Sequence, residues 1–353
     1  MTRNRVNEID LLRFLAALAV VFFHYAFRGY AADGLTILPY LSLSSVAKYG
    51  YLGVQLFFMI SGFVILMTAA NGSLQDFVVS RIVRLYPAFW ICCTVTFLFI
   101  VLLGEPIYSA SLGEYLVNLT MLSGIVGVES IDDAYWSLFI ELNFYGLVTV
   151  VLFFKKIHSA ERFIAAWLLM SIALKGVDRI YPSTILSSIF IIEYSEYFVA
   201  GATFYFIWSK GLSPVRGVII LLTWGLALFK TLRALPKFEA HYSVVMDYYV
   251  VVAVVSAFFV VMFFVSMRYT GRLGKIDWRF LGVLTYPLYL IHQKVGFIIF
   301  NNLYLKVNVD IIFWGTFALV LLFAYIIHRV FEIRLAALMR ISLSKIFVKP
   351  VLV

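Results

Sequence analysis

The stretch IDLLRFLAALAVVFFHY, from Ile9 to Tyr25, decides the fold class. It is nearly long enough by itself to cross the hydrocarbon core of a bilayer, which takes roughly 20 mostly apolar residues. It also carries an arginine at 13 and a histidine at 24. Polar side chains inside such a segment are costly, so they need partners or a function. The stretch therefore predicts a membrane helix with a functional polar stripe.

The composition of the whole chain supports a membrane protein. Of its 353 residues, 63% are hydrophobic and 13% are charged, whereas soluble domains are about half apolar and about a quarter charged. Lys and Arg exceed Asp and Glu by nine charges. Basic residues gather in the cytosolic loops of membrane proteins, so we interpret the excess as a sign of topology. The expected partner is a lipid bilayer, and we expect no nucleic-acid partner.

The predicted fold is an all-α, polytopic membrane helical bundle of about ten transmembrane helices. Long apolar runs mark each helix, and the segment 105–134 forms a longer connection with a partly membrane-embedded character. No internal repeat is evident. The ten expected helices are 9–28, 51–70, 86–104, 135–155, 161–177, 188–208, 214–233, 245–267, 280–303 and 309–330.

The distribution of basic residues predicts the orientation. An even number of helices puts both termini on one side. With both termini cytosolic, the inner segments hold 18 Lys and Arg and the outer ones nine, which agrees with the positive-inside rule. Glu105, Glu114, Glu129, Asp132 and Asp133 make the 105–134 connection acidic, as suits the outer face. We therefore expect an N-in, C-in multi-pass protein.

The first helix carries its polar residues on one face. Arg13 and His24 are 11 residues apart, which is three helical turns plus about 20°, and about 16 Å along the axis. Asp10 lies three residues before Arg13, close enough to pair with it. Arg13 serves either as an interfacial anchor or in binding a ligand. His24 either makes a structural hydrogen bond between helices or acts as a general base.

A second polar stripe is expected at the depth of His24. The segment DDAYWSLFIELNFYG, from Asp132 to Gly146, opens the fourth helix. Its Ser137, Glu141 and Tyr145 repeat every four residues and share one face. A carboxylate in the membrane needs a polar partner, so Glu141 is either structural or paired with His24. A His–Glu pair would orient the imidazole and stabilise its protonated form.

The segment SRIVRLYP, from Ser80 to Pro87, lies on the predicted cytosolic side. If it is helical, Arg81 and Arg84 share a face and can grip phosphates. The alternative is that they only set topology and contact headgroups.

Other polar residues have less specific signals. Small residues around Ser61 favour close helix packing. In FLGVLTYPLYLIHQ, His292 follows Tyr289 by three residues, and either structural bonding or a lining role fits both. The adjacent Cys92 and Cys93 have no disulfide or metal spacing and are expected to pack in the core. Glu193 and Glu196 form a further pair without an assigned role.

Taken in order, five motifs resemble the acyltransferase 3 family of bacterial integral-membrane acyltransferases. The resemblance covers nearly the whole chain, and it implies a single acyltransferase 3 membrane domain over 1–353, without the hydrolase-like extracytoplasmic domain that many members carry. The motifs are IDLLRFLAALAVVFFHY, GVQLFFMISGFVI, SRIVRLYP, YWSLFIELNFYG and LGVLTYPLYLIH.

The resemblance implies transfer of an acyl group, usually acetyl from acetyl-CoA, to a hydroxyl of a cell-envelope sugar at the bacterial inner membrane. It implies that His24 is the catalytic base and Glu141 its partner, and that Arg13, Arg81 and Arg84 handle the acyl-CoA co-substrate. The expected acceptor is a glycan or lipid-linked sugar, and no metal is expected. Candidates for substrate contact or structural support are Asp10, Ser61, Tyr86, Trp136, Ser137, Tyr145, Tyr289 and His292.

The expected mechanism is a vectorial transfer. The CoA phosphates rest on the arginines at the cytosolic face, and the thioester reaches His24, which takes the proton of a sugar hydroxyl arriving from outside. Ser61, Tyr289 or backbone donors stabilise the oxyanion. An acyl-enzyme route through His24 is the alternative. Two rival functions remain: a transporter or flippase using the same polar residues as a relay, and a non-catalytic membrane scaffold or sensor.

Overall fold

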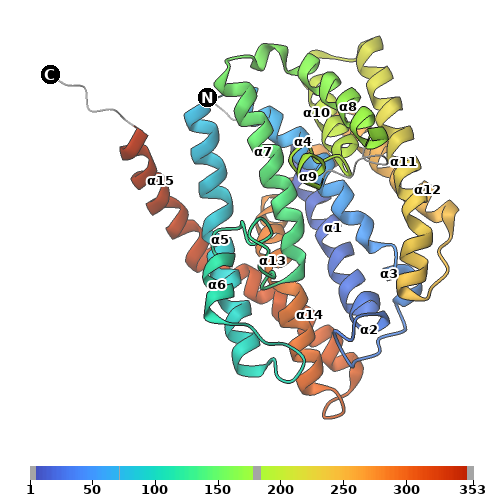
Figure 1. The fold of residues 1–353 in the computed structure, drawn as a ribbon, viewed down its shortest axis with the longest axis vertical. Coiled ribbons are helices and arrows are strands. Elements are labelled where there is room, and N and C mark those ends of the chain that lie inside the picture. Colours follow the sequence, from blue (N-terminus) through green and yellow to red (C-terminus); the bar gives the residue numbers. More distant parts are fainter. Residues whose placement is uncertain (1–4, 71, 178–183, 348–353) are drawn as a thin grey trace. The chain divides into compact units, whose positions relative to one another are not determined.

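The computed structural model describes residues 5–70, 72–177 and 184–347. Every regular element in these ranges is a helix, and no strand occurs among them (Figure 1). The all-α prediction is therefore confirmed. The chain divides into two compact units, which we call unit 1 (Met1–Ala19, Tyr49–Asn71 and Ile140–Arg279) and unit 2 (Val20–Lys48, Gly72–Phe139 and Phe280–Val353). The single-domain organisation stays a prediction.

Unit 1 is built around the close packing of two helices, α4 and α10. A Cβ atom added at Gly201 in α10 would lie 1.8 Å from the carbonyl oxygen of Met59 in α4, and one added at Gly62 would lie 2.2 Å from the carbonyl of Phe198. Small residues permit such backbone approach between membrane helices. The α-helices of unit 1 are α4 (Gly53–Ala70), α8 (Ala160–Val177), α9 (Thr184–Ile189), α10 (Ser195–Lys210), α11 (Pro214–Tyr242) and α12 (Tyr248–Ser266). Its short 3-10 helices are η2 (Gly50–Leu52), η4 (Ile157–Ser159) and η5 (Leu273–Lys275).

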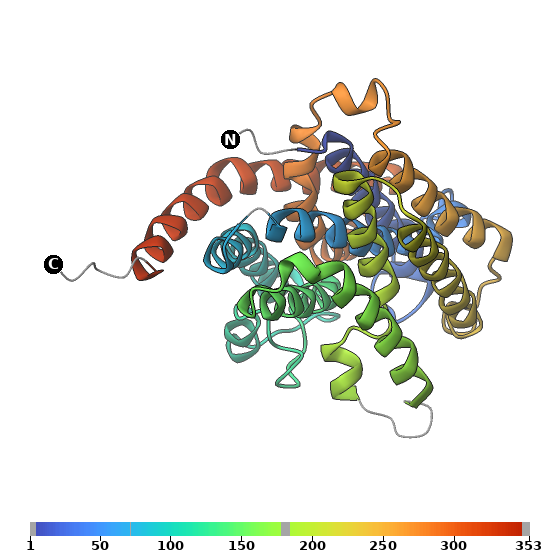
Figure 2. The ribbon, with the colours of Figure 1, turned by 90° about the horizontal axis from the view of Figure 1, so that it is seen from above.

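Unit 2 contains the long helix α5 (Leu74–Leu103), which contacts both the π-helix η6 (Ile327–Glu332) and α15 (Ile333–Phe347). The C-terminal end of α15 points away from α5 (Figure 1, Figure 2). The other helices of this unit are η1 (His24–Arg28), α2 (Gly29–Ala31), α3 (Ser44–Ala47), α6 (Leu112–Asn118), η3 (Asp133–Tyr135), α13 (Arg279–Leu303) and α14 (Val309–Ile326). Three helices contribute residues to both units: α1 (Asn7–Phe23), α7 (Trp136–Phe153) and α13, whose first residue Arg279 belongs to unit 1.

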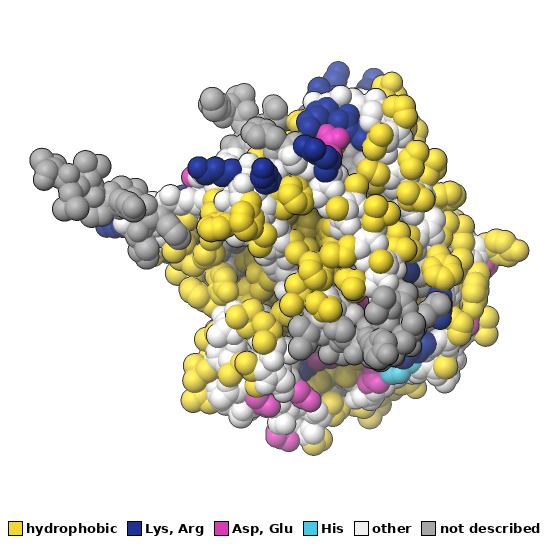
Figure 3. Space-filling view, turned by 45° about the horizontal axis from the view of Figure 1, so that its top comes forward, with side chains coloured by type: hydrophobic (Ala, Val, Ile, Leu, Met, Phe, Trp, Pro, Cys, Tyr) yellow, Lys and Arg dark blue, Asp and Glu magenta, His cyan; other side chains and the backbone are white. Residues whose placement is uncertain are grey.

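Eight helical segments among the described residues are long and apolar enough to cross a membrane. Their outward faces carry many large hydrophobic side chains, including Leu221, Phe229 and Val260, and hydrophobic side chains cover much of the face in Figure 3. Such a surface suits lipid as solvent. The chain is thus a multi-pass membrane protein.

The two remaining expected spans, 161–177 and 188–208, differ from the other eight. Helix α8 carries Glu161, Arg162 and Lys175 within its 18 residues. The second expected span is divided into α9 and α10, because Ile191 adopts a left-handed conformation with φ 53°, which a regular helix does not tolerate. Helix α10 then has 16 residues, or about 24 Å at 1.5 Å per residue. Both segments stay predicted spans.

Helix α5 begins earlier than expected. The sequence predicts a start near residue 86, whereas the helix starts at Leu74. Ser73 caps it: its hydroxyl accepts from the Asp76 N–H, and the Asp76 carboxylate accepts from the Ser73 N–H. Pro87 lies inside the helix, as membrane helices tolerate. The SRIVRLYP segment is therefore helical, and its arginines at 81 and 84 share a face.

Candidate functional site

His24 occupies an unusual position at the end of the first helix. Helix α1 runs into η1, a five-residue π-helix from His24 to Arg28, without a break in helical backbone angles. Short π-helical turns are rare and occur frequently at functional sites. The His24 side chain is 6% exposed, so its ring nitrogens depend on partners within the protein.

The partner of His24 in unit 2 is a second histidine. His24 Nδ1 lies 2.9 Å from His292 Nε2 in α13 and 2.9 Å from the carbonyl oxygen of Val20. His292 Nδ1 lies 2.8 Å from the carbonyl oxygen of Tyr289, and the Tyr25 hydroxyl donates to the carbonyl of His292 at 2.6 Å. His292 is fully buried. The two imidazoles form a chain that ends on backbone carbonyls.

This chain of contacts fixes the tautomers of the neutral pair. A carbonyl oxygen only accepts hydrogen bonds, so His292 carries its proton on Nδ1 and accepts on Nε2. His24 must then carry its proton on Nδ1, donating toward His292 and Val20. The lone pair of His24 is consequently on Nε2, the nitrogen that can act as a base.

Arg28 faces that basic nitrogen. Its Nη1 lies 3.3 Å from His24 Nε2, one helical turn further along the chain. The Nε atom of Arg28 is buried and has no hydrogen-bond partner within the part of the chain that the structure describes. No role was predicted for Arg28 from the sequence. Its spacing of four from His24 is the signal that could have found it.

The segment 132–135 holds the part of α13 that carries His292. Asp132 Oδ2 accepts from the Lys294 N–H at 2.9 Å, and Tyr135 OH donates to the carbonyl of Leu290 at 3.2 Å. Asp132 Oδ1 accepts from the Ala134 N–H at 2.9 Å. Burial raises the pKa of Asp132 to about 6, and the neighbouring Asp133 carboxylate adds to the rise. The loop thereby positions the backbone on both sides of His292.

The predicted polar stripe of α7 splits between two sets of partners. Ser137 Oγ lies 2.7 Å from the hydroxyl of Tyr289, which donates to the carbonyl of Ala134 at 3.2 Å. Glu141, in unit 1, accepts from Ser61 Oγ at 2.9 Å and from Tyr145 OH at 2.6 Å on the same oxygen, Oε1. The pairing of Glu141 with His24 stays a prediction.

Arg84 has a carboxylate partner that the sequence did not indicate. Its Nη1 donates to Glu332 Oε1 at 3.0 Å, and its guanidinium lies 5.7 Å from the centre of the Tyr286 ring. His328 Nδ1 lies 2.8 Å from Glu332 Oε2. His328 and Glu332 belong to η6, a second π-helix. Their i, i+4 spacing was the available signal.

The other predicted donor-binding residues lie on α1 and α5. Arg81 Nε donates to Ser80 Oγ at 3.2 Å, and its guanidinium lies 6.0 Å from the Phe77 ring centre. Asp10 accepts from Arg5 Nε at 3.0 Å, which gives it a basic partner other than the expected Arg13. The Asp10–Arg13 pairing and the role of Arg13 stay predictions.

A cavity of about 150 Å³ lies beside the start of α7. Aromatic and polar side chains line it, among them Tyr135, Trp136, Asn118, Ser123 and Ser130. Tyr86, on the neighbouring α5, donates its hydroxyl hydrogen to the carbonyl of Thr120 in the 105–134 connection at 3.1 Å. Aromatic faces beside hydroxyl and amide groups suit a small polar ligand.

The glutamates without an assigned role are both paired in unit 1. Glu196 is buried and accepts from Lys230 Nζ at 2.5 Å. Glu193 pairs with Lys175. The cysteines at 92 and 93 are free and buried, as core packing requires. Within 5–70, 72–177 and 184–347, no three His, Cys, Asp or Glu side chains group closely enough to hold a metal ion.

Comparison with known proteins identifies the family to which this chain is similar. A model described as an acyltransferase domain matches residues 6–329. A protein of Acidianus two-tailed virus named "Putative acetyltransferase ORF330" is 28% identical over 155 residues, which are 43% of this chain and 42% of that protein. The peptidoglycan O-acetyltransferase OatA of Listeria monocytogenes is 30% identical over 163 residues, which are 41% of this chain and 24% of OatA. The matches thus span less than half of either relative, and no solved structure matches the chain.

Proposed function

The chain belongs to the acyltransferase family whose domain model it matches along nearly its whole length, and from this premise we propose that it is a membrane O-acyltransferase of the cell envelope. It moves an acyl group, acetyl from cytosolic acetyl-CoA, to a hydroxyl of an envelope or exported glycan at the bacterial inner membrane. The names of the two acetyltransferase relatives support acetyl as the acyl group.

The observation that carries this proposal is the buried histidine pair. Transfer from a thioester to a sugar hydroxyl needs a neutral base, because a hydroxyl is a poor nucleophile until its proton is removed. The contacts of His292 leave the lone pair of His24 on Nε2. An imidazole held in one tautomer and one orientation is the form that general-base catalysis uses.

The proposed reaction begins when the acceptor hydroxyl replaces Arg28 at His24 Nε2. His24 takes the hydroxyl proton, and the sugar oxygen forms a bond to the thioester carbonyl carbon. The tetrahedral intermediate then expels the CoA thiolate, which takes the proton back from His24. During this cycle the charged imidazole keeps its Nδ1–H on His292 Nε2 and the Val20 carbonyl.

Arg28 is the best-placed donor for the oxyanion. Once it leaves His24 Nε2, its guanidinium N–H groups can bind the negative oxygen of the intermediate, and its buried Nε already lacks a partner. The two oxyanion donors predicted from the sequence have other partners: Ser61 donates to Glu141, and Tyr289 donates to the Ala134 carbonyl. We therefore assign oxyanion stabilisation to Arg28.

The donor is assigned to the arginines of α5. Arg81 and Arg84 lie one turn apart on one helix, and guanidinium groups bind phosphate in a bidentate manner. Because Glu332 already pairs with Arg84, the CoA phosphates must compete with that carboxylate. Arg13 on α1 is proposed as the third phosphate contact.

The acceptor is assigned to the small cavity beside α7. Tyr135 lines this cavity and also donates to the Leu290 carbonyl, two residues before His292. Trp136 provides an aromatic face of the kind on which sugar rings stack, and Ser123 and Ser130 provide hydroxyl groups. Replacing Trp136 by alanine should raise the KM for the acceptor more than the KM for acetyl-CoA.

The test uses purified protein in liposomes with labelled acetyl-CoA and a crude envelope-glycan extract. We expect wild type to release free CoA and to label the glycan. His24→Ala should lower turnover by about 10²- to 10⁴-fold, the usual contribution of a general base. The matched control is His241→Ala, because His241 is a histidine of the exposed end of α11.

Two further experiments test the role of Glu141 and distinguish direct transfer from an acyl-enzyme route. Glu141→Gln tests the proposed partnership with His24, which requires a loss of turnover without loss of folding. A burst of enzyme-bound label before the acceptor is added would favour an acyl intermediate on His24. A folded wild type that turns over no acyl-CoA with any extract would refute the acyltransferase and favour the transporter.

A further inference from the structure

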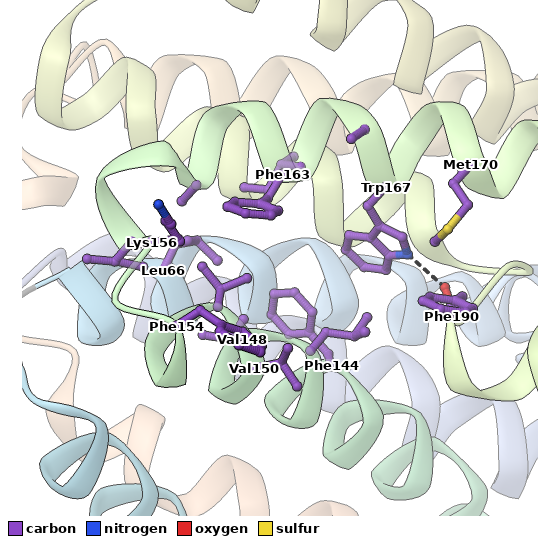
Figure 4. Close-up of a pocket in the computed structure, with 16 residues that line it drawn as sticks. Leu66, Phe144, Val148, Val150, Phe154, Lys156, Phe163, Trp167, Met170 and Phe190 are labelled. Atoms are coloured by element: carbon purple, nitrogen blue, oxygen red, sulfur yellow. Dashed lines mark hydrogen bonds between the residues drawn. The ribbon is translucent and has the colours of Figure 1, made fainter.

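A second and larger cavity lies in unit 1. It is a groove of about 500 Å³ between α7 and α8, and Leu66 of α4 also lines it. Its walls are almost wholly apolar, with Phe144, Val148, Phe163 and Trp167 among them (Figure 4). The Trp167 Nε1–H donates to the carbonyl of Phe190 at 2.9 Å, so even this polar group is satisfied.

The groove is elongated and has one cationic end. Lys156 lies at one end, and Met170 and Phe190 lie at the other (Figure 4). The wall formed by α8 runs from Ala160 to Met170, which is about 15 Å along a helix axis. This length is about half of the roughly 30 Å hydrocarbon thickness of a bilayer. The groove is therefore about as long as one leaflet is thick.

The groove opens toward lipid. Val150, Phe154 and Phe163 line it and are 55%, 64% and 43% exposed. Helix α7 is one of the eight candidate membrane spans, so its outward face meets acyl chains. A cavity with apolar walls offers water no hydrogen bonds. A hydrocarbon chain is consequently the natural occupant.

The charge at the end of the groove selects the headgroup. Lys155 and Lys156 are both exposed, and the described residues provide no ion-pair partner for either ammonium. Of the two, only Lys156 lines the groove. Arg162, one turn into α8, adds a further exposed positive charge. A phosphate at this level would meet Lys156 while its chain lies along the walls.

We propose that the groove between α7 and α8 binds one acyl chain of an anionic membrane phospholipid, with the lipid phosphate on Lys156. Apolar burial alone gives little preference, because lipid tails are as apolar as the groove. The selectivity must come from the lysine. One lysine near the membrane surface favours an anionic lipid by about fivefold.

The experiment measures which lipid reaches Trp167. Brominated chains quench tryptophan fluorescence on contact, so the protein is placed in phosphatidylcholine vesicles with a small fraction of brominated phosphatidylglycerol or brominated phosphatidylcholine. The chain has seven tryptophans, and the signal lost in Trp167→Phe isolates the groove. We expect phosphatidylglycerol to quench this signal about fivefold more strongly at equal mole fraction.

Matched variants test each part of the proposal. Lys156→Gln should reduce quenching by phosphatidylglycerol to the phosphatidylcholine level, whereas Lys155→Gln, the adjacent lysine outside the groove, should keep the preference. Ala166→Phe, which narrows the groove, should weaken quenching by both lipids. Equal quenching by the two lipids in wild type overturns the proposal. Displacement by a long-chain acyl-CoA without any phosphatidylglycerol preference also overturns it and assigns the groove to a donor chain.

Discussion

His24 Nδ1 lies 2.9 Å from His292 Nε2, although the two residues are 268 positions apart in the sequence. This contact brings the end of the first helix onto α13 and makes one imidazole the orienter of the other. The role resembles that of the carboxylate in other base–orienter pairs. The difference is that a neutral imidazole supplies less charge stabilisation, so tautomer and orientation are its main contribution.

Replacing His292 by phenylalanine tests this role. The change removes the acceptor of the His24 Nδ1–H and releases the imidazole from its tautomer. We expect kcat for glycan acetylation to fall by about 10- to 100-fold, with little change in the KM for acetyl-CoA. The loss should be smaller than for a carboxylate partner, because a neutral imidazole orients the base more weakly. Steady-state kinetics and the pH dependence of kcat provide the measurement. Unchanged kcat in a folded variant would assign His292 to packing alone.

Substitution of Arg28 tests whether this residue is the oxyanion donor. Removing one such donor typically costs about 10²- to 10³-fold in kcat, so Arg28→Ala should lose activity by that amount at unchanged acceptor KM. Arg28→Lys should recover part of the activity, because it keeps the charge but loses the fork of N–H donors. If both variants only raise a KM, Arg28 binds substrate and the oxyanion donor lies elsewhere.

The Arg84–Glu332 pair predicts a trade-off between stability and donor binding. Glu332 is 7% exposed and Arg84 is 34% exposed, and Glu332 also contacts His328, so losing Arg84 should cost about 1–3 kcal/mol, the cost of leaving a buried polar group short of one partner. Arg84→Ala should therefore lower the thermal midpoint and also raise the KM for acetyl-CoA. Glu332→Gln frees Arg84 for phosphate, so the KM should fall while stability drops.

The double variant separates the two effects of this pair. Arg84→Ala combined with Glu332→Gln also removes the buried carboxylate charge that Arg84 no longer balances, so part of the stability should return. The KM should stay high because no guanidinium remains at this position. A KM that returns with the stability would mean that Arg84 acts only as a structural cation.

The raised pKa of Asp132 predicts that the stability of the protein depends on pH. Burial raises the pKa of its carboxyl to about 6 in the folded state, from about 3.9 in an unfolded chain, so the folded state holds the proton more tightly than the unfolded state. The stabilising contribution is complete below about pH 4 and is lost as the pH rises through about 6. A shift of about two pKa units corresponds to about 3 kcal/mol.

The measurement is the unfolding midpoint in detergent between pH 4 and 8, for wild type and Asp132→Asn. The variant has lost one acceptor for the N–H groups of Ala134 and Lys294, so it should be less stable than wild type at pH 4. It should nevertheless lack the decrease between pH 4 and 6 that Asp132 contributes. Parallel pH curves for the two proteins would show that Asp132 does not titrate in this range.

The sequence predicts much of this fold and only part of the site. Apolar runs identify the membrane helices because lipid demands continuous hydrophobic segments. The cost of burying polar groups points to His24 and Glu141. Helical geometry gives a depth for each residue but no contacts across helices, so the sequence predicted Glu141 as the partner of His24 and did not indicate the contact between His24 and His292. Ile191 divides α9 from α10 through a backbone conformation that an apolar run does not reveal.

The contact between α4 and α10 yields a prediction about stability that is independent of catalysis. A methyl group at Gly201 would lie 1.8 Å from the Met59 carbonyl, and backbone cannot move aside as a flexible side chain can. Gly201→Ala should therefore force the two helices apart and lower the thermal midpoint in detergent, by an amount typical of overpacking, about 1–3 kcal/mol. The matched control is Gly225→Ala in α11, where a Cβ meets nothing within 4 Å. That change should be neutral or slightly stabilising, because alanine favours a helix over glycine. Equal midpoints for the two variants would show that α4 and α10 do not pack this closely.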